Sequence, residues 1–354
     1  MSDSIGCLRS RLEHLFLDGA LNCLQDFLTR HLVEAWASEL GHRWRTCLFS
    51  PLPTLLACIY KQLAAGTSCR DVEDWVASRL PPTDSTNAGD DFCEARKRLP
   101  ESLFARALAH LGALASDSAL PKVWLVDGTG LTLPRSAANF EAFGKPHRNS
   151  SFPGARLLLL TDAQSGAFGE RIRELPSFMR VRVVRVGIER KGYRPVNISI
   201  ATNLLDAAQW PPSKIIELYA LRWRIENDIR DLKLRHGLAM LSCKSEDTVR
   251  KEVWSALIAC NAVRVMQSKT GQCPRSLSHE RCRAILLEAC SQMAQALTTC
   301  LPMLNKRLLK RIAQCKLKRQ ERPPCPRALI RNPRTDYPFL NRTRQAWYAH
   351  YLAA

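Results

Sequence analysis

Residues 214–238 read KIIELYALRWRIENDIRDLKLRHGL, and this stretch combines two patterns with the period of an α-helix. Tyr219, Arg222, Glu226 and Lys233 follow one another at steps of three, four and seven, which return to one helix face. A neighbouring stripe is apolar and would dock the helix on a sheet. Its members are Ile215, Leu218, Leu221, Ile225, Ile229 and Leu232. The spacing therefore predicts a half-buried helix whose polar face carries one acid, one phenol and two cations.

This polar face has two interpretations. A carboxylate flanked by a phenol and two cations could bind a metal ion and hold phosphate groups around it. A solvated helix face with Arg–Glu pairs, each stabilising the helix by about 0.2–0.5 kcal/mol, has the same spacing. Both interpretations predict a helix here.

A second candidate lies upstream, where the apolar run from Lys122 ends at Asp127. Residues 128–133 then predict a turn and a second strand, stopped by Pro134. A carboxylate at the end of a buried strand is held by rigid backbone and suits a hard divalent cation. Because Asp-Gly is also common in turns, a purely structural Asp127 is the alternative.

The rest of the sequence predicts an α/β protein in which helical segments precede and follow the strands along the chain. Apolar spacings of three and four predict helices over most of residues 8–120 and over 249–267 and 280–300. Strands are predicted at 155–162, 179–186 and 193–202. We therefore expect three regions: a helical domain over 1–120, an α/β core over 121–250 with a β insertion at about 179–203, and a helical region with a basic tail over 251–354.

The charge favours a polyanionic partner. Lys and Arg total 52 against 33 Asp and Glu, which leaves a net charge of +19 in 354 residues. Between Lys306 and Arg344, 13 basic and two acidic residues give 11 of these excess charges. A concentrated basic segment is typical of chains that lie along nucleic-acid phosphates. A basic cytosolic enzyme unrelated to DNA is the other class that this composition permits.

The 14 cysteines show no CxxC pair and no disulfide framework. Cys273, His279 and Cys282 lie near one another, but they lack paired zinc spacing, so a structural zinc is not expected there. The first residues have no apolar leader, and no stretch approaches about 18 uninterrupted apolar residues. These features predict an intracellular protein with reduced thiols and no membrane partner.

The motifs resemble those of a known family. Tyr219-x2-Arg222-x3-Glu226-x6-Lys233 matches the YREK signature of IS4-family DDE transposases. The segment from Asp127 to Pro134 is similar to the family's first catalytic Asp segment, and residues 241–254 resemble the block after the YREK helix. The tail sequences at 331–334 and 337–340 are similar to the family's basic ending.

This resemblance implies an RNase H-like catalytic core and a helical N-terminal domain that binds DNA. In the family, two Asp and one Glu hold two Mg²⁺ (or Mn²⁺) ions for cleavage and transfer of DNA strands. Carried onto this chain, Asp127 and Glu226 would be catalytic metal ligands, and Tyr219, Arg222 and Lys233 would bind DNA phosphates. The implied partners are double-stranded DNA, as terminal inverted repeats and target, and a second copy of the chain. The implied location is the bacterial cytoplasm, with the nucleoid.

The chain departs from the family at the second catalytic Asp. Only residues 171–178 (RIRELPSF) separate the strand at 155–162 and its turn from the inserted β segment. Eight residues cannot supply a helix, its turn and a buried strand, so that segment is expected to be deleted and the core incomplete. Asp162 is the best geometric substitute. The alternative function is a non-catalytic DNA-binding remnant or an inhibitor of transposition.

Overall fold

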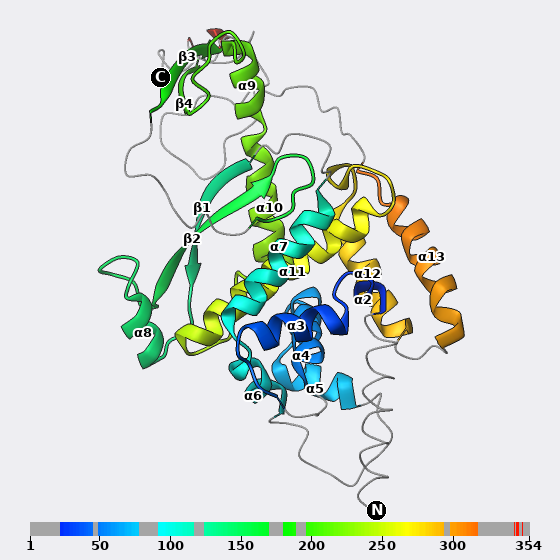
Figure 1. Ribbon diagram of the computed structural model, residues 1–354. Helices are drawn as coiled ribbons and strands as arrows, with labels where there is room; N and C mark the ends of the chain where they lie inside the picture. Colours follow the sequence, from blue (N-terminus) through cyan, green and yellow to red (C-terminus); the bar gives the residue numbers. More distant parts are fainter. Residues whose placement is uncertain are drawn as a thin grey trace, which may run out of the picture. The chain divides into compact units, whose positions relative to one another are not determined.

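The computed structural model describes residues 22–44, 49–77, 91–116, 124–169, 180–188, 196–293 and 298–317, with a few positions beyond 342 (Figure 1). The helices before residue 117 are α2 (Asn22–Gln25), α3 (Arg30–Glu39), α4 (Pro51–Leu63), α5 (Cys69–Ala77), α6 (Asp91–Arg98) and α7 (Glu101–Ala115). The central elements are β1 (Trp124–Thr132), α8 (Ala137–Phe143), β2 (Gly154–Asp162), β3 (Arg182–Ile188), β4 (Val196–Thr202), α9 (Pro212–Ala220) and α10 (Arg222–Arg235). They are followed by α11 (Glu246–Ser268), η1 (Pro274–Ser276), α12 (His279–Met293), η2 (Thr298–Cys300) and α13 (Leu301–Ala313).

Three helices form the centre of the larger unit. Every residue of α4 is buried, the polar Thr54, Lys61 and Gln62 included, and Pro51 occupies its first turn, where the missing N–H costs nothing. The long helix α11 packs along both α7 and α4, and Figure 1 shows α7 and α11 lying side by side. One hydrophobic cluster joins these helices to β1, β2, α10, α12 and α13.

The strands β1 and β2 form an antiparallel pair that passes without interruption through Gly128, opposite Leu158. The predicted turn at Gly128 is therefore wrong, because pairing with β2 holds this glycine in an extended strand. The face bearing Leu125 and Leu131 is buried, and the alternate residues face outward, with Val126 half exposed. The pairing places Asp127 in the middle of β1, on the inner face, and not at a strand end.

The strands β3 and β4 form a second antiparallel pair, which confirms the hairpin predicted at 179–186 and 193–202. With α9 they belong to a separate unit, whose small core consists of Val184, Ile200 and Ile215. The guanidinium of Arg182 donates a hydrogen bond to the Trp210 carbonyl at 2.8 Å. Each of the two strands has one buried face, with Val184 and Ile200 in the core, although the outer face of β3 also carries the apolar Val183.

The compact units do not coincide with the three predicted regions. The larger unit comprises the described parts of 1–172 and 221–317, and the smaller one those of 173–220 and 318–354. The boundary predicted near 250 falls inside a shared core, because α11 packs against α7 of the N-terminal region. The deletion window at 171–178 and the tail motifs at 331–334 and 337–340 lie outside the described residues. No helix in the described ranges is long and apolar enough to cross a bilayer.

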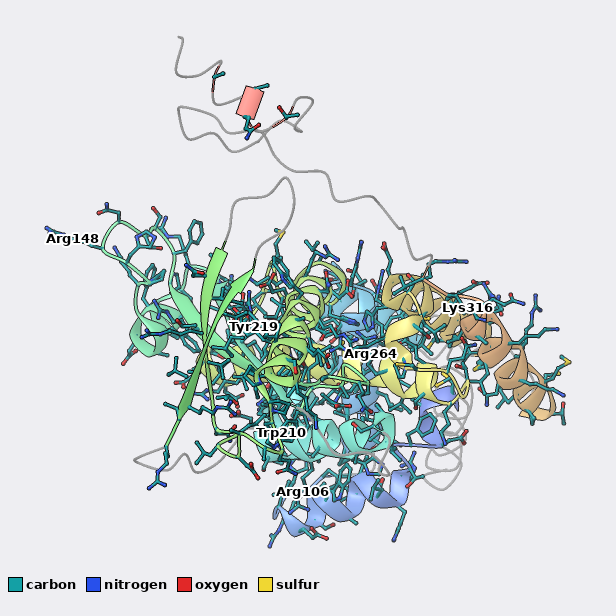
Figure 2. The ribbon with its side chains drawn as sticks, turned by 90° about the horizontal axis from the view of Figure 1, so that it is seen from above. Arg106, Arg148, Trp210, Tyr219, Arg264 and Lys316 are labelled. Atoms are coloured by element: carbon teal, nitrogen blue, oxygen red, sulfur yellow. The ribbon has the colours of Figure 1, made fainter. Side chains whose placement is uncertain are left out.

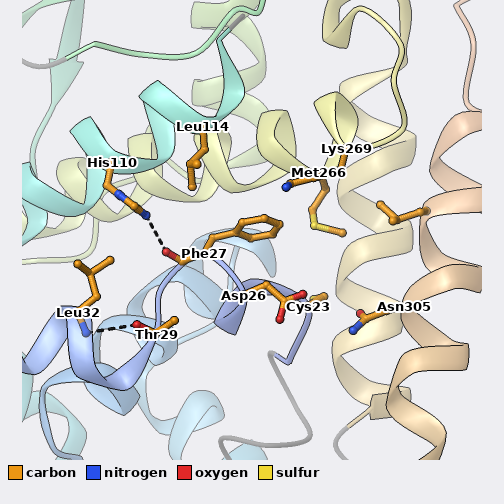
Figure 3. A pocket seen from close by; sticks show the side chains of 11 residues that line it. Cys23, Asp26, Phe27, Thr29, Leu32, His110, Leu114, Met266, Lys269 and Asn305 are labelled. Atoms are coloured by element: carbon orange, nitrogen blue, oxygen red, sulfur yellow. Dashed lines mark hydrogen bonds between the residues drawn. The ribbon is translucent and has the colours of Figure 1, made fainter. Parts of the chain in front are cut away.

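A pocket of about 390 Å³ lies within the larger unit, between α2, α7, α11 and α13 (Figure 3). Phe27, Leu114 and Met266 give it apolar walls, and Asp26 and Lys269 add charge. The ring nitrogen Nε2 of His110 lies 2.8 Å from the Phe27 carbonyl, and the phenyl ring of Phe27 lies 5.2 Å from the Lys269 ammonium. These contacts tie α7 and α11 to the residues that follow α2.

Candidate catalytic and DNA-binding site

Asp127 projects from the inner face of β1 toward α10. Its Oδ1 accepts a hydrogen bond from the Gly128 N–H at 2.8 Å, and its side chain is 30% exposed. The buried neighbours Leu125 and Leu131 anchor this face of the strand in the core. The carboxylate therefore stands on rigid backbone with one side reached by solvent.

Arg222 brings the two candidate carboxylates together. Its Nη1 atom lies 2.9 Å from Glu226 Oε1 and 3.6 Å from Asp127 Oδ2. Asp127 and Glu226 are 99 positions apart in the sequence, and these two oxygens are separated by no more than the sum of the two distances. The guanidinium thus links a carboxylate of β1 to one of α10.

Lys233 lies further along α10 and contacts the same strand. Its Nζ donates a hydrogen bond to the Gly130 carbonyl at 2.9 Å. Since Gly130 follows Asp127 by three residues on β1, α10 runs alongside the strand over this length, as Figure 1 shows. Arg222, Glu226 and Lys233 therefore share one face of α10, directed at β1.

Tyr219 lies on a different helix from the other members of the signature. The continuous helix predicted from residue 213 onward is wrong at one position: α9 ends at Ala220 and α10 begins at Arg222. Leu221 caps α10, and its carbonyl accepts from the Arg224 N–H at 2.8 Å, the short i to i+3 bond of a tightened first turn. Tyr219 belongs to the smaller unit, so its place on a common face with Glu226 stays a prediction.

A buried ion network that the sequence reasoning missed holds α10 in position. Asp228 is 1% exposed and accepts from Arg264 on α11 at 3.0 Å and from Arg275 on η1 at 2.6 and 3.1 Å. Figure 2 shows Arg264 in the middle of the helical body. Asp228 follows Glu226 by two residues, so the network fixes the helix segment that carries the candidate ligand. The sequence offered one signal for this network, since Asp228 is an acid on the apolar side of the predicted helix.

A second buried network explains the segment after α10. Glu252 on α11 accepts hydrogen bonds from the Ser242 N–H and Oγ–H and from the Cys243 N–H, and its Oε1 lies 3.1 Å from Lys61 Nζ on α4. Burial raises the pKa of Glu252, but the Lys61 ammonium and these hydrogen bonds outweigh it and hold the pKa below its ordinary value. The carboxylate thereby clamps residues 241–244, one of the family-like blocks, to two helices.

Asp162 does not join the cluster. It pairs with Trp124 across the ribbon, and positions 124 and 127 of β1 point to opposite faces because side chains alternate along a strand. Its Oδ2 accepts from the Ser165 Oγ–H at 2.6 Å and from the Ser165 N–H at 3.0 Å. Asp162 is 3% exposed and serves the turn at Gly166, whose φ of 74° favours glycine. Its geometry is that of a structural turn residue.

The chemistry of Asp127 and Glu226 is that of ligands for a hydrated divalent cation. Both supply hard oxygen ligands, and their side chains are 30% and 35% exposed, which leaves access for the water that Mg²⁺ retains. To share one ion, their oxygens must lie within about 4 Å, twice the Mg–O distance of about 2.1 Å. The Arg222 guanidinium lies between them, so it has to move aside before an ion binds.

Comparison with known proteins agrees with the resemblance. Residues 170–262 match the family model described as a transposase DDE domain. A curated relative, the transposase InsG for insertion sequence element IS4 of Escherichia coli (strain K12), is 29% identical over 107 residues. The chain is related to the IS4-family DDE transposases. The family match contains Glu226 and begins after Asp127.

The likeness to IS4-family transposases is confined to part of the molecule. The segment shared with the InsG transposase is 28% of this chain and 23% of the relative's length. No solved structure matches the chain. The mixture of helices and strands in the described residues is consistent with a DDE transposase domain.

Proposed function

We propose that the chain is a transposase of an IS4-type insertion sequence, which binds terminal inverted repeats and cleaves and transfers DNA strands with Mg²⁺ or Mn²⁺. Asp127 and Glu226 are the metal ligands, and Tyr219, Arg222 and Lys233 bind DNA phosphates. One observation carries this proposal: Arg222 joins a carboxylate of β1 to one of α10. A solvated helix face would pair Arg222 with Glu226 alone, and it would not direct Asp127 to the same group.

The distribution of charge supports a DNA partner. Lys306, Arg307 and Lys310 are exposed along α13, at the start of the basic stretch. Lys145 and Arg148 are exposed in the loop after α8, and Figure 2 shows Arg148 at the outer end of that loop. Cations held on a folded surface neutralise phosphates and release counterions, so binding should weaken steeply with salt. The same proposal includes a homodimer on the DNA, in the bacterial cytoplasm beside the chromosome.

The proposed core is RNase H-like and incomplete. A two-ion mechanism places one ion on the attacking oxygen and one on the leaving oxygen, which takes more ligands than two carboxylates. Within the described ranges, no third acid joins Asp127 and Glu226 in a group able to hold a metal, and β1 and β2 pair only with each other as named strands. This favours a second candidate function: a non-catalytic DNA-binding remnant that occupies transposon ends or inhibits an intact transposase.

A nicking assay separates the two candidates. The substrate is a labelled duplex with the genomic sequence flanking each end of the coding region, and a shuffled duplex is the reference. For a working site, the full chain nicks the flanking duplex with Mg²⁺ or Mn²⁺, whereas Asp127→Asn and Glu226→Gln bind it without nicking. Glu94→Gln is the matched control, because Glu94 is an exposed carboxylate whose partner is Lys97 on the same helix.

The remaining outcomes are equally decisive. Binding of the flanking duplex by the parent chain without any nicking establishes the remnant and excludes the active transposase. Binding that is indifferent to salt and to sequence excludes both candidates, since phosphate neutralisation must weaken as salt rises.

A further inference from the structure

Three nitrogen and sulfur side chains meet in the core, away from the carboxylate pair. His236 follows the last turn of α10, Cys260 lies on α11, and His279 begins α12. Their exposed fractions are 0%, 0% and 5%. The Nε2 atoms of the two rings are 2.8 Å apart, and Cys260 Sγ lies 3.7 Å from His279 Nε2. One candidate ligand atom from each residue lies within 4.8 Å of the others.

Two of the three separations are close to those of a tetrahedral zinc site. With Zn–N of about 2.05 Å and Zn–S of about 2.3 Å, ligand atoms around zinc are separated by about 3.3 to 3.6 Å. The sulfur–nitrogen separation of 3.7 Å already agrees, and the nitrogen–nitrogen separation of 2.8 Å has to widen by a few tenths of an ångström. Binding zinc would require the imidazoles to turn by this amount and to bring His236 and Cys260, whose ligand atoms lie within 4.8 Å of each other, to the same separation.

Burial acts differently on the three groups: it raises the pKa of the Cys260 thiol to about 12, so this group can bind a metal only by losing its proton, whereas it keeps the two imidazoles uncharged. Burial, with the positive charges of Arg264 and Arg283, lowers the pKa of His236 to about 3 and that of His279 well below its ordinary value. Both rings are therefore neutral at physiological pH and have a lone pair to donate. The Nδ1 atom of His279 is buried without a hydrogen-bond partner in the described residues, so hydrogen bonding does not fully account for this ring.

We propose that His236, Cys260 and His279 bind one structural Zn²⁺, which ties the end of α10 to α11 and α12. Zinc is favoured over harder cations because imidazole and thiolate are its usual ligands. On binding, the Cys260 thiol loses its proton to solvent, the sulfur bonds to zinc, and no oxidation or reduction occurs. Among the described residues the group has three candidate ligands, so a water molecule would complete a tetrahedral site. The site differs from the sequence pattern at Cys273, His279 and Cys282, of which it uses only His279.

Metal content and a cobalt spectrum test this proposal. The full chain is produced in zinc-supplemented medium, freed of loose metal by gel filtration, and analysed for zinc and copper. We expect about one zinc per chain, and after exchange a thiolate-to-cobalt charge-transfer band with visible bands of tetrahedral Co²⁺. X-ray absorption of the zinc-loaded parent should show nitrogen and sulfur ligands together. This measurement needs no variant to fold.

Variants assign the ligands. Cys260→Ser should lose the charge-transfer band and at least tenfold in zinc affinity, whereas Cys58→Ser should keep both. Cys58 is the matched control because it is also a fully buried thiol on a helix, 2% exposed. His279→Gln should lose zinc as Cys260→Ser does, and circular dichroism establishes that each variant keeps its helices.

Three results would overturn the zinc site. They are a parent chain that takes up neither zinc nor cobalt, a parent that holds copper in place of zinc, and a folded Cys260→Ser variant with an unchanged cobalt spectrum. Each of these results leaves the DNA-binding proposal untouched, since the nicking assay depends on Asp127 and Glu226.

Discussion

Replacing Asp228 by Asn should destabilise the chain severely while changing almost no volume. The Asp228 carboxylate is 1% exposed and accepts three hydrogen bonds from two guanidinium groups, whose side chains are 4% (Arg264) and 12% (Arg275) exposed. Asn removes the negative charge and leaves both cations buried. Breaking a buried ion pair by removing one partner costs about 3–5 kcal/mol. Because two cations lose their partner here, we expect a loss near the upper end, about 4–5 kcal/mol in the free energy of unfolding.

Urea unfolding followed by circular dichroism measures this loss. Since domains are typically stable by about 5–15 kcal/mol, the variant should unfold at a much lower urea concentration than the parent. The matched control is Glu246→Gln on α11, whose partner Arg250 lies 2.7 Å away at an exposed position. An exposed pair contributes about 0.2–1 kcal/mol, so this variant should resemble the parent.

The comparison has a clear negative outcome. If Asp228→Asn lost no more stability than Glu246→Gln, the buried network would contribute nothing, and another feature would have to hold α10 against α11. Should Asp228→Asn fail to fold, Arg275→Met tests the same network. The expected loss of stability is smaller, because Asp228 keeps its hydrogen bond from Arg264.

Three further predictions concern Glu252 in the core and Lys233 and Arg222 on α10. Glu252→Gln should lower the stability at neutral pH by about 3 kcal/mol, because the buried Lys61 loses its partner. The pKa of Glu252 in the folded chain is below its unfolded value of 4.5. The stability that the ionised carboxylate contributes is therefore complete above pH 4.5 and is lost as the pH falls through the folded pKa. Thermal melts of the parent and the variant should converge in acid. Lys233→Ala should weaken binding of the flanking duplex and reduce the log–log salt slope by about 1, and an unchanged slope would exclude a phosphate contact. Arg222→Ala should also weaken that complex but tighten Mn²⁺ binding at the two carboxylates; weaker Mn²⁺ binding in calorimetry would show that the guanidinium does not compete with the ion.

The helices and most strands could be predicted because their patterns are local. The apolar spacing in α4 and α11 and the alternation in β3 were readable from the sequence. The turn predicted at Gly128 failed because strand pairing with Leu158 is a tertiary contact that glycine tolerates. Similarly, nothing in the residues around Leu221 marks the end of α9, since this residue keeps helical dihedral angles.

The candidate site could be predicted in part, and this prediction needed the family resemblance in addition to the helical spacing. Spacing placed Arg222 and Glu226 on one helix face, but only the family resemblance linked them to Asp127, which lies 99 positions before Glu226. The groups that hold α10 and the segment after it escaped prediction because their partners are distant. Asp228 contacts a residue 36 positions away, and Glu252 contacts one 191 positions away. A single sequence can mark Asp228 as an acid on the apolar side of a helix, but it carries no signal for the distant partner.

The N-terminal and C-terminal helices of the larger unit share one hydrophobic core, and this limits where the chain can be cut into fragments. Leu56 of α4, Leu111 of α7 and Val263 of α11 belong to one cluster that also reaches Ile312 of α13. Cutting the chain near residue 120 would expose that surface on both fragments. The N-terminal helices are therefore not a portable module, because they share their hydrophobic core with α11 and α13.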